Sequence, residues 1–412
     1  MKYGLIGEHL SHSFSKAIHE QIGGYVYEIK EIEPEKLEEF IKSKDFLGIN
    51  VTIPYKERVI PYLDFVDESA KKIGAVNTVV NRGGKLYGYN TDYSGMLALV
   101  NKIGIDIKDK KVLIIGTGGT SKTATAVVKS LGAREIIYVS NIAVDGAYTY
   151  EQVYSDHLDV EVIFNTSPVG MYPRNDTMPI DLEKFKSLVG VVDVVYNPIR
   201  TSLVLKAQQM GLKSEGGLYM LGAQAVYAYE HFSGTRVDKS MCDRIYNTVL
   251  KEKDNIALIG MPACGKSSVG KSLSALCGKT LVDIDSEIIQ LAEMDIPTIF
   301  EKYGEERFRE LEAQVIKEVS KKNGLIIATG GGAILRSDNV NALKQNSTVY
   351  FIDRSLELLV PTEDRPLGST KEAIQKRYEE RYPIYNSVCD KKIDGDGTVF
   401  EVAEKIFQEW NK

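Results

Sequence analysis

Two glycine-rich stretches of this sequence carry the residue types that hold phosphate groups. Residues 260–267, GMPACGKS, fit the pattern GxxxxGK(S/T), follow the apolar run IALIG and precede a helical pattern. In such a loop, backbone N–H groups and the helix N-terminus attract phosphate oxygens, the lysine reaches the outer phosphates and the hydroxyl ligates Mg²⁺. A structural turn with a chance Gly-Lys pair would not reproduce both spacing and context. The stretch predicts a site for ATP or GTP with Mg²⁺, formed by Gly260, Gly265, Lys266, Ser267 and Ser268.

The second stretch, GTGGTS at residues 116–121, has a different design. It follows the apolar run KVLIIG and precedes the helical pattern TATAVVKSLG. Gly-x-Gly-Gly is a variant of the turn that binds the pyrophosphate of a nicotinamide dinucleotide. A glycine-rich turn alone is a weak indication, but the strand–turn–helix context and the later run EIIYVS strengthen it. We expect the dinucleotide at Gly116, Gly118, Gly119 and Thr120.

Two carboxylates follow the next apolar run after the GKS loop. LVDIDSE (281–287) places Asp283 and Asp285 two residues apart, side by side at the expected strand end. One of them can belong to a metal shell while the other accepts a substrate hydroxyl. Four later stretches, taken singly, are typical of solvated helix faces and flexible turns: FEKYGEERFRELE (300–312), ATGGGAIL (328–335), EDRPLG (363–368) and RYEERYPIYNSVCD (377–390).

The order and spacing of these stretches resemble the shikimate kinases over roughly residues 256–412. The resemblance implies that Asp285 accepts the shikimate hydroxyls and acts as the base, with Asp283 near Mg²⁺. It also implies that Arg309 and Arg381 bind the shikimate carboxylate, a task suited to forked guanidinium groups. The implied site is completed by two glycines that admit the ring and by a lid arginine over the transferring phosphoryl group, namely Gly331, Gly332 and Arg365.

The sequence departs from the kinase pattern in two places. Pro262 and Ala263 stand in the phosphate loop where the family usually has glycine. The segment LELLVPTED (356–364) lacks the arginine that the family commonly places before the lid to stack on adenine. We therefore expect altered affinity or selectivity for the nucleotide.

The first 250 residues carry a second ordered set of motifs. Taken alone, HSFS would be a helix N-cap. The complete set resembles shikimate dehydrogenase over roughly residues 1–250. Its members are HSFS (12–15), NVTIPYK (50–56), AVNT (75–78), GYNTD (88–92), NTSPVGM (165–171), DVVYNP (193–198) and GGLYMLGAQA (216–225).

The resemblance implies that Ser13 and Ser15 hold the substrate carboxylate and that Lys56 and Asp92 form the catalytic pair. Reduction of a ketone needs a hydride donor and a proton donor at the carbonyl oxygen, and a lysine beside a carboxylate can supply that proton. A surface lysine after a turn is the alternative for Lys56, which its polar strand-end context disfavours. The ring hydroxyls would be oriented by Thr52, Asn77, Asn90, Tyr196 and Gln224, while Gly217 would contact the cofactor.

The choice between NADP and NAD rests on the end of the strand after the GTGGTS helix. The family usually shows Asn-Arg-Thr there, and its arginine binds the 2′-phosphate of NADP. This chain has Asn141, Ile142 and Ala143, and Asp145 comes a few residues late for the ribose of NAD. The resemblance favours NADP, with Asn141 at the cofactor, and NAD stays open.

Alternating strand and helix patterns must position these residues. Runs rich in Val and Ile at 2–7, 25–30 and 47–53 predict strands, and PEKLEEFIKSK (34–44) predicts a helix. Residues 75–92 predict a hairpin that turns at Arg82-Gly83-Gly84. Two helices are expected between residues 216 and 250, followed by KEKDN (251–255) as a short charged connector. This alternation indicates an α/β fold with parallel sheets.

Composition and net charge argue against two classes of partner and leave small anionic ligands open. Of the 412 residues, 43% are apolar and 26% are charged, and the net charge of −6 argues against nucleic acid or an anionic membrane as a partner. The N-terminus lacks a signal-peptide pattern, the apolar runs are too short to span a bilayer, and the four cysteines lack metal-ligand spacing. We expect a cytoplasmic protein, and no stretch indicates an oligomeric state.

We predict three lobes. Residues 1–100 with 216–250 form a substrate-binding lobe, residues 101–215 a Rossmann lobe for NADP, and residues 255–412 a P-loop domain like the nucleoside-monophosphate kinases. The chain would reduce 3-dehydroshikimate to shikimate and then phosphorylate shikimate with ATP. Two alternatives stay open: a C-terminal part that senses nucleotides without catalysis, and a quinate/shikimate dehydrogenase that uses NAD.

Overall fold

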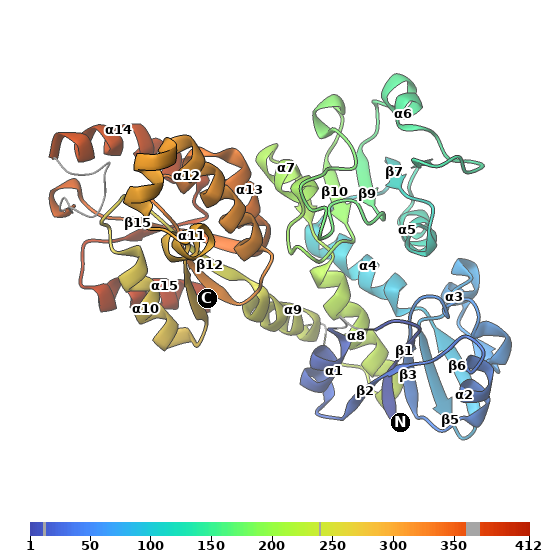
Figure 1. Ribbon diagram of the computed structural model, residues 1–412. Coiled ribbons are helices and arrows are strands. Elements are labelled where there is room, and N and C mark those ends of the chain that lie inside the picture. The colour runs from blue at the N-terminus through green and yellow to red at the C-terminus, as the bar shows by residue number, and fades with distance from the viewer. Residues whose placement is uncertain (11–13, 239, 360–370) are drawn as a thin grey trace. The chain divides into compact units, whose positions relative to one another are not determined.

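The computed structural model describes residues 1–10, 14–238, 240–359 and 371–412 (Figure 1). The chain forms two compact units, Met1–Leu250 and Lys251–Lys412. Within these described ranges, no helix is long and apolar enough to cross a membrane. The α/β class predicted from the alternation of strand and helix patterns is confirmed, and the bounds of the three predicted lobes stay a prediction.

The first unit contains a six-stranded sheet in the order β2-β1-β3-β5-β6-β4. The strand β5 runs antiparallel to both β3 and β6, as the predicted hairpin requires, with Arg82 paired to Lys85. The strands are β1 (Tyr3–Gly7), β2 (Tyr27–Glu31), β3 (Gly48–Val51), β4 (Phe65–Val66), β5 (Thr78–Arg82) and β6 (Lys85–Tyr89). The accompanying helices are α1 (Ser15–Gly23), α2 (Leu37–Ser43), the 3-10 turn η1 (Ile60–Tyr62) and α3 (Glu68–Ile73).

Helix α2 begins three residues later than the sequence pattern suggests. The prediction of a helix from Pro34 is wrong at this end, because Lys36 N–H bonds to the carbonyl of Glu33 in a separate turn. The helix buries Leu37 and Ile41 in the core beside the sheet.

A five-stranded parallel sheet completes the first unit in the order β11-β10-β9-β7-β8. Its central strands are buried, as expected of a parallel sheet covered on both faces. The strands are β7 (Lys111–Ile115), β8 (Glu135–Val139), β9 (Val162–Asn165), β10 (Gly190–Asp193) and β11 (Lys213–Glu215). The helices are α4 (Thr91–Ile103), α5 (Gly119–Ser130), α6 (Tyr150–Asp156), η2 (Leu182–Lys184), α7 (Ser202–Gln209), α8 (Leu218–Ser233) and α9 (Ser240–Lys253). Helices α4 and α8 pack against each other.

The second unit is built on a five-stranded parallel sheet in the order β13-β14-β12-β15-β16. In Figure 1, helices lie around this sheet, and α10 packs against α15. The strands are β12 (Asn255–Ile259), β13 (Thr280–Asp283), β14 (Leu325–Ala328), β15 (Ser347–Asp353) and β16 (Lys391–Asp394). The helices are α10 (Lys266–Cys277), α11 (Ile284–Ala292), α12 (Ile296–Ser320), η3 (Ala333–Leu335), α13 (Ser337–Asn346), η4 (Leu356–Leu358), α14 (Lys371–Val388) and α15 (Val399–Asn411).

The expected connector at residues 251–255 is not a loop. Helix α9 continues to Lys253, and β12 begins at Asn255. The ammonium group of Lys279 donates to the carbonyls of Lys251 (2.9 Å) and Asp254 (2.8 Å). A cation at a helix C-terminus satisfies carbonyls that lack partners within the helix. This contact explains why a stretch rich in charges stays helical.

Candidate active sites

Lys56 and Asp92, 36 residues apart in sequence, are in direct contact. The Nζ atom of Lys56 lies 2.5 Å from Oδ2 of Asp92, and the two side chains are 30% and 20% exposed. Lys56 follows β3, and its carbonyl accepts a hydrogen bond from Val76 N–H (2.8 Å). Asp92 lies in the first turn of α4, whose N-cap Asn90 accepts from Tyr93 N–H (3.1 Å). The sheet and the capped helix thus hold an ammonium donor against a carboxylate.

A cavity of about 490 Å³, here called the Lys56 cavity, surrounds this pair. It gathers predicted site residues from the segments that follow β3 and β10, from the residue before β5, and from α1, α4, α5 and the start of α8, although they are spread over more than half of the first unit. Ser13 lies outside the described residues. The predicted residues that line the cavity are Ser15, Thr52, Lys56, Asn77, Asp92, Thr120, Tyr196, Gly217 and Gln224.

Two amide side chains of the Lys56 cavity are oriented by their hydrogen bonds. The Oδ1 atom of Asn77 accepts the backbone N–H of Thr91 at 2.7 Å, which leaves the NH₂ group of Asn77 as a donor for a ligand. The NH₂ group of Gln224 donates to the carbonyl of Leu221 at 3.1 Å, which leaves its oxygen as an acceptor. The cavity therefore offers a donor and an acceptor for hydroxyl groups.

Asn50 also lines the Lys56 cavity, although the sequence analysis gave it no role. Its Oδ1 atom accepts from the hydroxyl of Tyr27 (2.7 Å), and its NH₂ group donates to Thr78 Oγ1 (3.0 Å). His19 stacks on the ring of Tyr27, and burial lowers the pKa of His19 to about 3, so this support is uncharged at neutral pH. The signal was present, because Asn50 opens the motif NVTIPYK.

Asn90 is not among the described residues that line the Lys56 cavity. Its oxygen caps α4, and its NH₂ group donates to the carbonyl of Ala75 at 2.9 Å. Gly217 does line the cavity, where a Cβ atom would lie 2.1 Å from the carbonyl oxygen of Val194. The structure therefore gives both residues a local structural task, and the roles predicted for them at substrate and cofactor stay predictions.

The glycine-rich turn at residues 116–121 connects β7 to α5. Gly116 has φ +101°, a conformation that favours glycine. A Cβ atom added at Gly118 or Gly119 would meet no described atom within 4 Å, so open space lies over the N-terminus of α5. This space and the helix N-terminus fit a pyrophosphate group. Asn141 lies on the exposed loop after β8.

In the second unit, the phosphate loop runs from Gly260 to Gly265, with φ values of +150° and +91° at these glycines. Lys266 is buried, and its Nζ atom donates to the carbonyls of Gly260 and Met261, both at 2.9 Å. Ser268 follows in the first turn of α10. The lysine thus bonds to its own loop, where the loop N–H groups and the helix N-terminus fit the phosphates of a nucleotide.

Ser267 and Asp283 meet at the end of β13. The hydroxyl of Ser267 donates to Asp283 Oδ2, and Asp283 Oδ1 caps α11 through the N–H of Asp285 (3.0 Å). Of the two carboxylates expected side by side at a strand end, only Asp283 ends the strand, because the chain turns into α11 at Ile284 and Asp285 lies in the first turn of that helix. The described ranges contain no group of three or more His, Cys, Asp or Glu residues that could hold a metal ion. A hydroxyl beside one carboxylate still fits Mg²⁺, which keeps several waters and takes few protein ligands.

Arg309 is held by two carboxylates of α12. Its guanidinium group contacts Glu312 at 2.7 Å and Glu305 at 3.1 Å, and a Cβ atom on Gly332 would lie 2.5 Å from it. Burial lowers the pKa of Arg309, but the two carboxylates outweigh this effect and raise it. Burial raises the pKa of Glu312, against the effect of Arg309. A side chain at position 332 would thus displace this guanidinium group from its present place.

Glu312 is a site residue that the sequence analysis missed. It is fully buried, and its Oε1 atom lies close to the backbone of Gly330, as does Oδ1 of Asp285. The sequence shows Glu312 only as one of several acids on a charged helix, and helical spacing to Arg309 was the available signal.

Arg381, on helix α14, also lies at the GGG turn that Arg309 approaches. It is largely buried, and it donates to the carbonyl of Gly331 at 3.1 Å. The hydroxyl of Tyr385 bridges Gly331 (2.5 Å) to the phosphate-loop residue Gly260 (2.9 Å). The structure thus brings both predicted carboxylate-binding arginines to the GGG turn, beside the phosphate loop. Arg365 lies outside the described residues.

Comparison with known proteins supports two families. Residues 5–79 match the family model of the shikimate dehydrogenase substrate binding domain, and residues 262–411 match that of shikimate kinase. A shikimate dehydrogenase (NADP(+)) of Clostridium beijerinckii is 36% identical over 263 residues, which cover 60% of this chain and 96% of the relative.

Solved structures resemble the dehydrogenase part. A chorismate mutase/shikimate 5-dehydrogenase fusion protein from Clostridium acetobutylicum matches with a TM-score of 0.57 and 34% identity, covering 60% of this chain and 96% of that one. A shikimate 5-dehydrogenase from Thermus thermophilus, in complex with NADP(H) and shikimate, matches with a TM-score of 0.54 and 28% identity over 60% and 99%. The two resemblances predicted from the sequence are confirmed.

Proposed function

Since this chain belongs to the shikimate dehydrogenase family and continues into a shikimate kinase domain, we propose that it carries out two consecutive reactions. The chain is a bifunctional enzyme of the shikimate pathway, an oxidoreductase and a phosphotransferase. In the proposal, the first unit reduces 3-dehydroshikimate to shikimate with NADPH. The second unit transfers the γ-phosphoryl group of ATP to the 3-hydroxyl of shikimate.

In the first unit, Lys56 protonates the ketone oxygen of 3-dehydroshikimate. NADPH, when bound at the turn before α5, supplies the hydride that the carbonyl carbon receives. The ammonium group of Lys56 gives its proton to the developing alkoxide, and Asp92 at 2.5 Å keeps that ammonium group in place and aids its reprotonation. Ser15 contributes to the carboxylate site, while the NH₂ of Asn77 and the oxygen of Gln224 bind ring hydroxyls.

In the second unit, Arg309 and Arg381 bind the carboxylate of shikimate from opposite elements, α12 and α14. Asp285 accepts the proton of the 3-hydroxyl, whose oxygen forms the new bond to phosphorus as the bond to the leaving ADP breaks. Lys266 exchanges the carbonyls of Gly260 and Met261 for phosphate oxygens, and Ser267 and Asp283 hold Mg²⁺. Such a transfer depends mainly on positioning and charge neutralisation, which these residues supply.

One observation carries the proposal for each unit. For reduction it is the contact of Lys56 with Asp92 inside a cavity that also reaches the glycine-rich turn through Thr120. For phosphorylation it is the convergence of Arg309 and Arg381 on the GGG turn, next to the phosphate loop.

The test is a pair of separate half-reactions with the purified full chain. One assay follows NADPH or NADH oxidation with 3-dehydroshikimate, and the other follows ADP release from Mg-ATP with shikimate. We expect both activities, with NADPH preferred. Reduction without ADP release would mean that the second unit does not phosphorylate shikimate, and a preference for NADH would overturn the proposed cofactor.

A further inference from the structure

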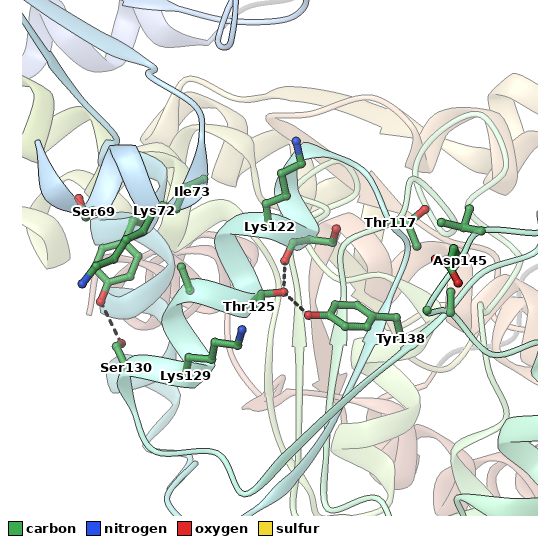
Figure 2. A pocket seen from close by; sticks show the side chains of 16 residues that line it. Ser69, Lys72, Ile73, Thr117, Lys122, Thr125, Lys129, Ser130, Tyr138 and Asp145 are labelled. Atoms are coloured by element: carbon green, nitrogen blue, oxygen red, sulfur yellow. Dashed lines mark hydrogen bonds between the residues drawn. The ribbon is translucent and has the colours of Figure 1, made fainter. Parts of the chain in front are cut away.

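A second cavity, of about 960 Å³, lies along the outer face of helix α5 (Figure 2). We call it the α5 cavity. It extends from Thr117 in the glycine-rich turn, past Thr125, to Ser130 at the end of the helix. The ring of Tyr138 from β8 forms part of its wall, and its hydroxyl pairs with that of Thr125 at 2.9 Å. The loop at residues 144–147 also lines the cavity, and in Figure 2 its Asp145 lies near Thr117.

The glycine-rich turn contributes to both cavities of the first unit. Thr120 lines the Lys56 cavity, whereas Thr117 and Ser121 line the α5 cavity. Between them, Gly118 and Gly119 leave open space above the helix N-terminus. The shape of a dinucleotide matches this arrangement of two cavities on either side of an open turn, because a dinucleotide has a ring system at each end and a pyrophosphate in the middle. When its nicotinamide lies beside Lys56 and its pyrophosphate above Gly118, its adenosine half faces the α5 cavity.

Positive charge in the α5 cavity comes from the helices and not from the end of β8. Lys72, Lys122 and Lys129 line it, and the loop adds one carboxylate, Asp145. Asn141 and Ile142 line a neighbouring hollow and are not among the described residues of the α5 cavity. A cation near the adenosine ribose is the feature that accommodates a 2′-phosphate.

Lys122 is the lysine nearest to the glycine-rich turn along the chain. Its Nζ atom pairs with Glu57 at 2.7 Å, and the two side chains are 50% and 62% exposed. An exposed ion pair of this kind contributes little free energy, so a phosphate dianion can replace the carboxylate. Lys129 lies seven residues further along α5, about 10 Å along the helix axis.

We propose that the α5 cavity receives the adenosine 2′-phosphate half of NADP and that Lys122 exchanges Glu57 for the 2′-phosphate. This inference rests on the proposed reduction by NADPH and identifies the residue that selects the cofactor. It also explains how the chain recognises NADP with Ile142 where the family has arginine. Asp145 would instead favour NAD as the cofactor, because a carboxylate near this ribose favours the free 2′-hydroxyl of NAD.

The test measures binding apart from catalysis. Isothermal titration calorimetry on the full chain compares adenosine 2′,5′-bisphosphate with adenosine 5′-phosphate, for the wild type, Lys122→Gln and Lys129→Gln. We expect the bisphosphate to bind more tightly to the wild type, and Lys122→Gln to weaken it about 10- to 100-fold, as loss of a charge-assisted hydrogen bond does. Binding of adenosine 5′-phosphate should change less than about twofold, within the range of exposed charges.

Lys129→Gln is the matched control, since it removes the same charge from the same helix face. An equal loss for Lys122→Gln and Lys129→Gln would overturn the inference, because it would reflect general charge and not one contact. Equal affinity of the wild type for both adenosine ligands, or binding of neither, would also overturn it. Weaker binding of adenosine 5′-phosphate to Asp145→Asn would assign the cavity to NAD instead.

A kinetic comparison separates this inference from the proposed function. If the wild type oxidises NADPH with 3-dehydroshikimate and Lys122→Gln raises KM for NADPH but not for NADH, both hold. If the wild type is active but Lys122→Gln raises neither KM, or both equally, only the role of Lys122 fails. If the wild type oxidises neither dinucleotide, the proposed function fails, while the calorimetric result still decides the role of Lys122.

Discussion

The two active sites hold their charged groups in different ways. In the first unit, Lys56 already contacts Asp92, the residue with which it is proposed to act. In the second unit, Lys266 bonds to carbonyls of its own loop and Arg309 bonds to Glu305 and Glu312. The proposed reductive site therefore has its charged pair in contact without ligands, whereas the proposed phosphoryl-transfer site holds its cations on protein oxygens that ligand oxygens would replace.

Two buried carboxylates, Asp193 in the first unit and Glu312 in the second, also differ in the groups that contact them. Asp193 at the end of β10 receives hydrogen bonds only from neutral groups among the described residues, namely Thr201 (2.6 Å), Val195 N–H and Asn165 (both 3.0 Å). Burial raises its pKa to about 7. Glu312 in the second unit is paired with Arg309. A buried acid is thus kept by neutral donors in one unit and by a cation in the other.

Removal of one central cation from each site tests most directly whether the two sites act independently. We expect Lys56→Ala to lower kcat for ketone reduction by at least about 100-fold, the usual contribution of a general acid, while shikimate phosphorylation is unchanged. Arg381→Ala should raise KM for shikimate in phosphorylation by about 10- to 100-fold and leave reduction unchanged. The measurement is steady-state kinetics of both half-reactions, and loss of both activities in either variant would contradict two independent sites.

A variant at Glu312 tests whether Arg309 depends on its buried partner. Glu312→Gln keeps an acceptor for Arg309 but removes the charge, and we expect KM for shikimate to rise about tenfold with a smaller change in kcat. Glu305→Gln is the matched control, because Glu305 contacts the same guanidinium group from an exposed position and should change KM less than about twofold. Equal effects of the two variants would show that burial of Glu312 does not matter for this site.

The pH dependence of stability tests the contrast between buried acids. The folded pKa of Asp193 is raised to about 7, so its protonated form stabilises the folded state fully below the unfolded value and less as pH rises through about 7. Asp193→Asn removes this loss, because an amide can satisfy the same three partners. We expect its gain in Tm over the wild type to be larger at pH 8 than at pH 5, as measured by differential scanning calorimetry.

Asp243→Asn provides a control of opposite sign in the same unit. Asp243 is exposed, and its hydrogen bond with Lys102 holds its pKa below the usual range. Its contribution to stability is therefore present at neutral pH and lost in acid. A gain in Tm for Asp193→Asn that is the same at pH 5 and pH 8 would contradict the assignment of the raised pKa to burial.

The smallest expected effect concerns the two glycine-rich turns. The turn before α5 uses glycine at its left-handed position Gly116, but the phosphate loop has Ala263 at φ +66°. This conformation costs alanine about 1–2 kcal/mol, and glycine loses about 0.5–1 kcal/mol of chain entropy in return. We expect Ala263→Gly to stabilise the second unit by about 1 kcal/mol, whereas Ala342→Gly inside α13 should destabilise it by a similar amount. A decrease in Tm for Ala263→Gly would contradict the strain at this position.

The motifs of the sequence indicated which candidate residues lie together better than they indicated the residues that support them. The meeting of Lys56 with Asp92 and of Arg309 and Arg381 at the GGG turn agrees with motifs whose order is characteristic of the families. Glu312 escaped prediction because burial of one acid among many on α12 depends on packing with distant elements. The sequence therefore showed where each motif lies, but it did not show which buried side chain, such as Glu312, supports the motif.

Local hydrogen bonds account for the remaining differences. The capping of α9 by Lys279 joins residues 28 apart, so the short charged run before β12 gave no sign that it would be helical. Asn90 lies within the motif GYNTD, yet its amide caps α4. The α5 cavity arises from helices α3, α4 and α5, strand β8, the glycine-rich turn and the loop at residues 144–147, and a one-dimensional pattern does not reveal such a space.

The most direct test of the account is conversion of 3-dehydroshikimate by the purified chain with NADPH and Mg-ATP together, followed by mass spectrometry of the products. We predict that shikimate 3-phosphate accumulates with the wild type. While the shikimate concentration stays below the raised KM of Arg381→Ala, this variant should accumulate mainly unphosphorylated shikimate. Formation of shikimate by the wild type without any phosphorylated product, even at high shikimate and ATP, would contradict the claim that both units are catalytic.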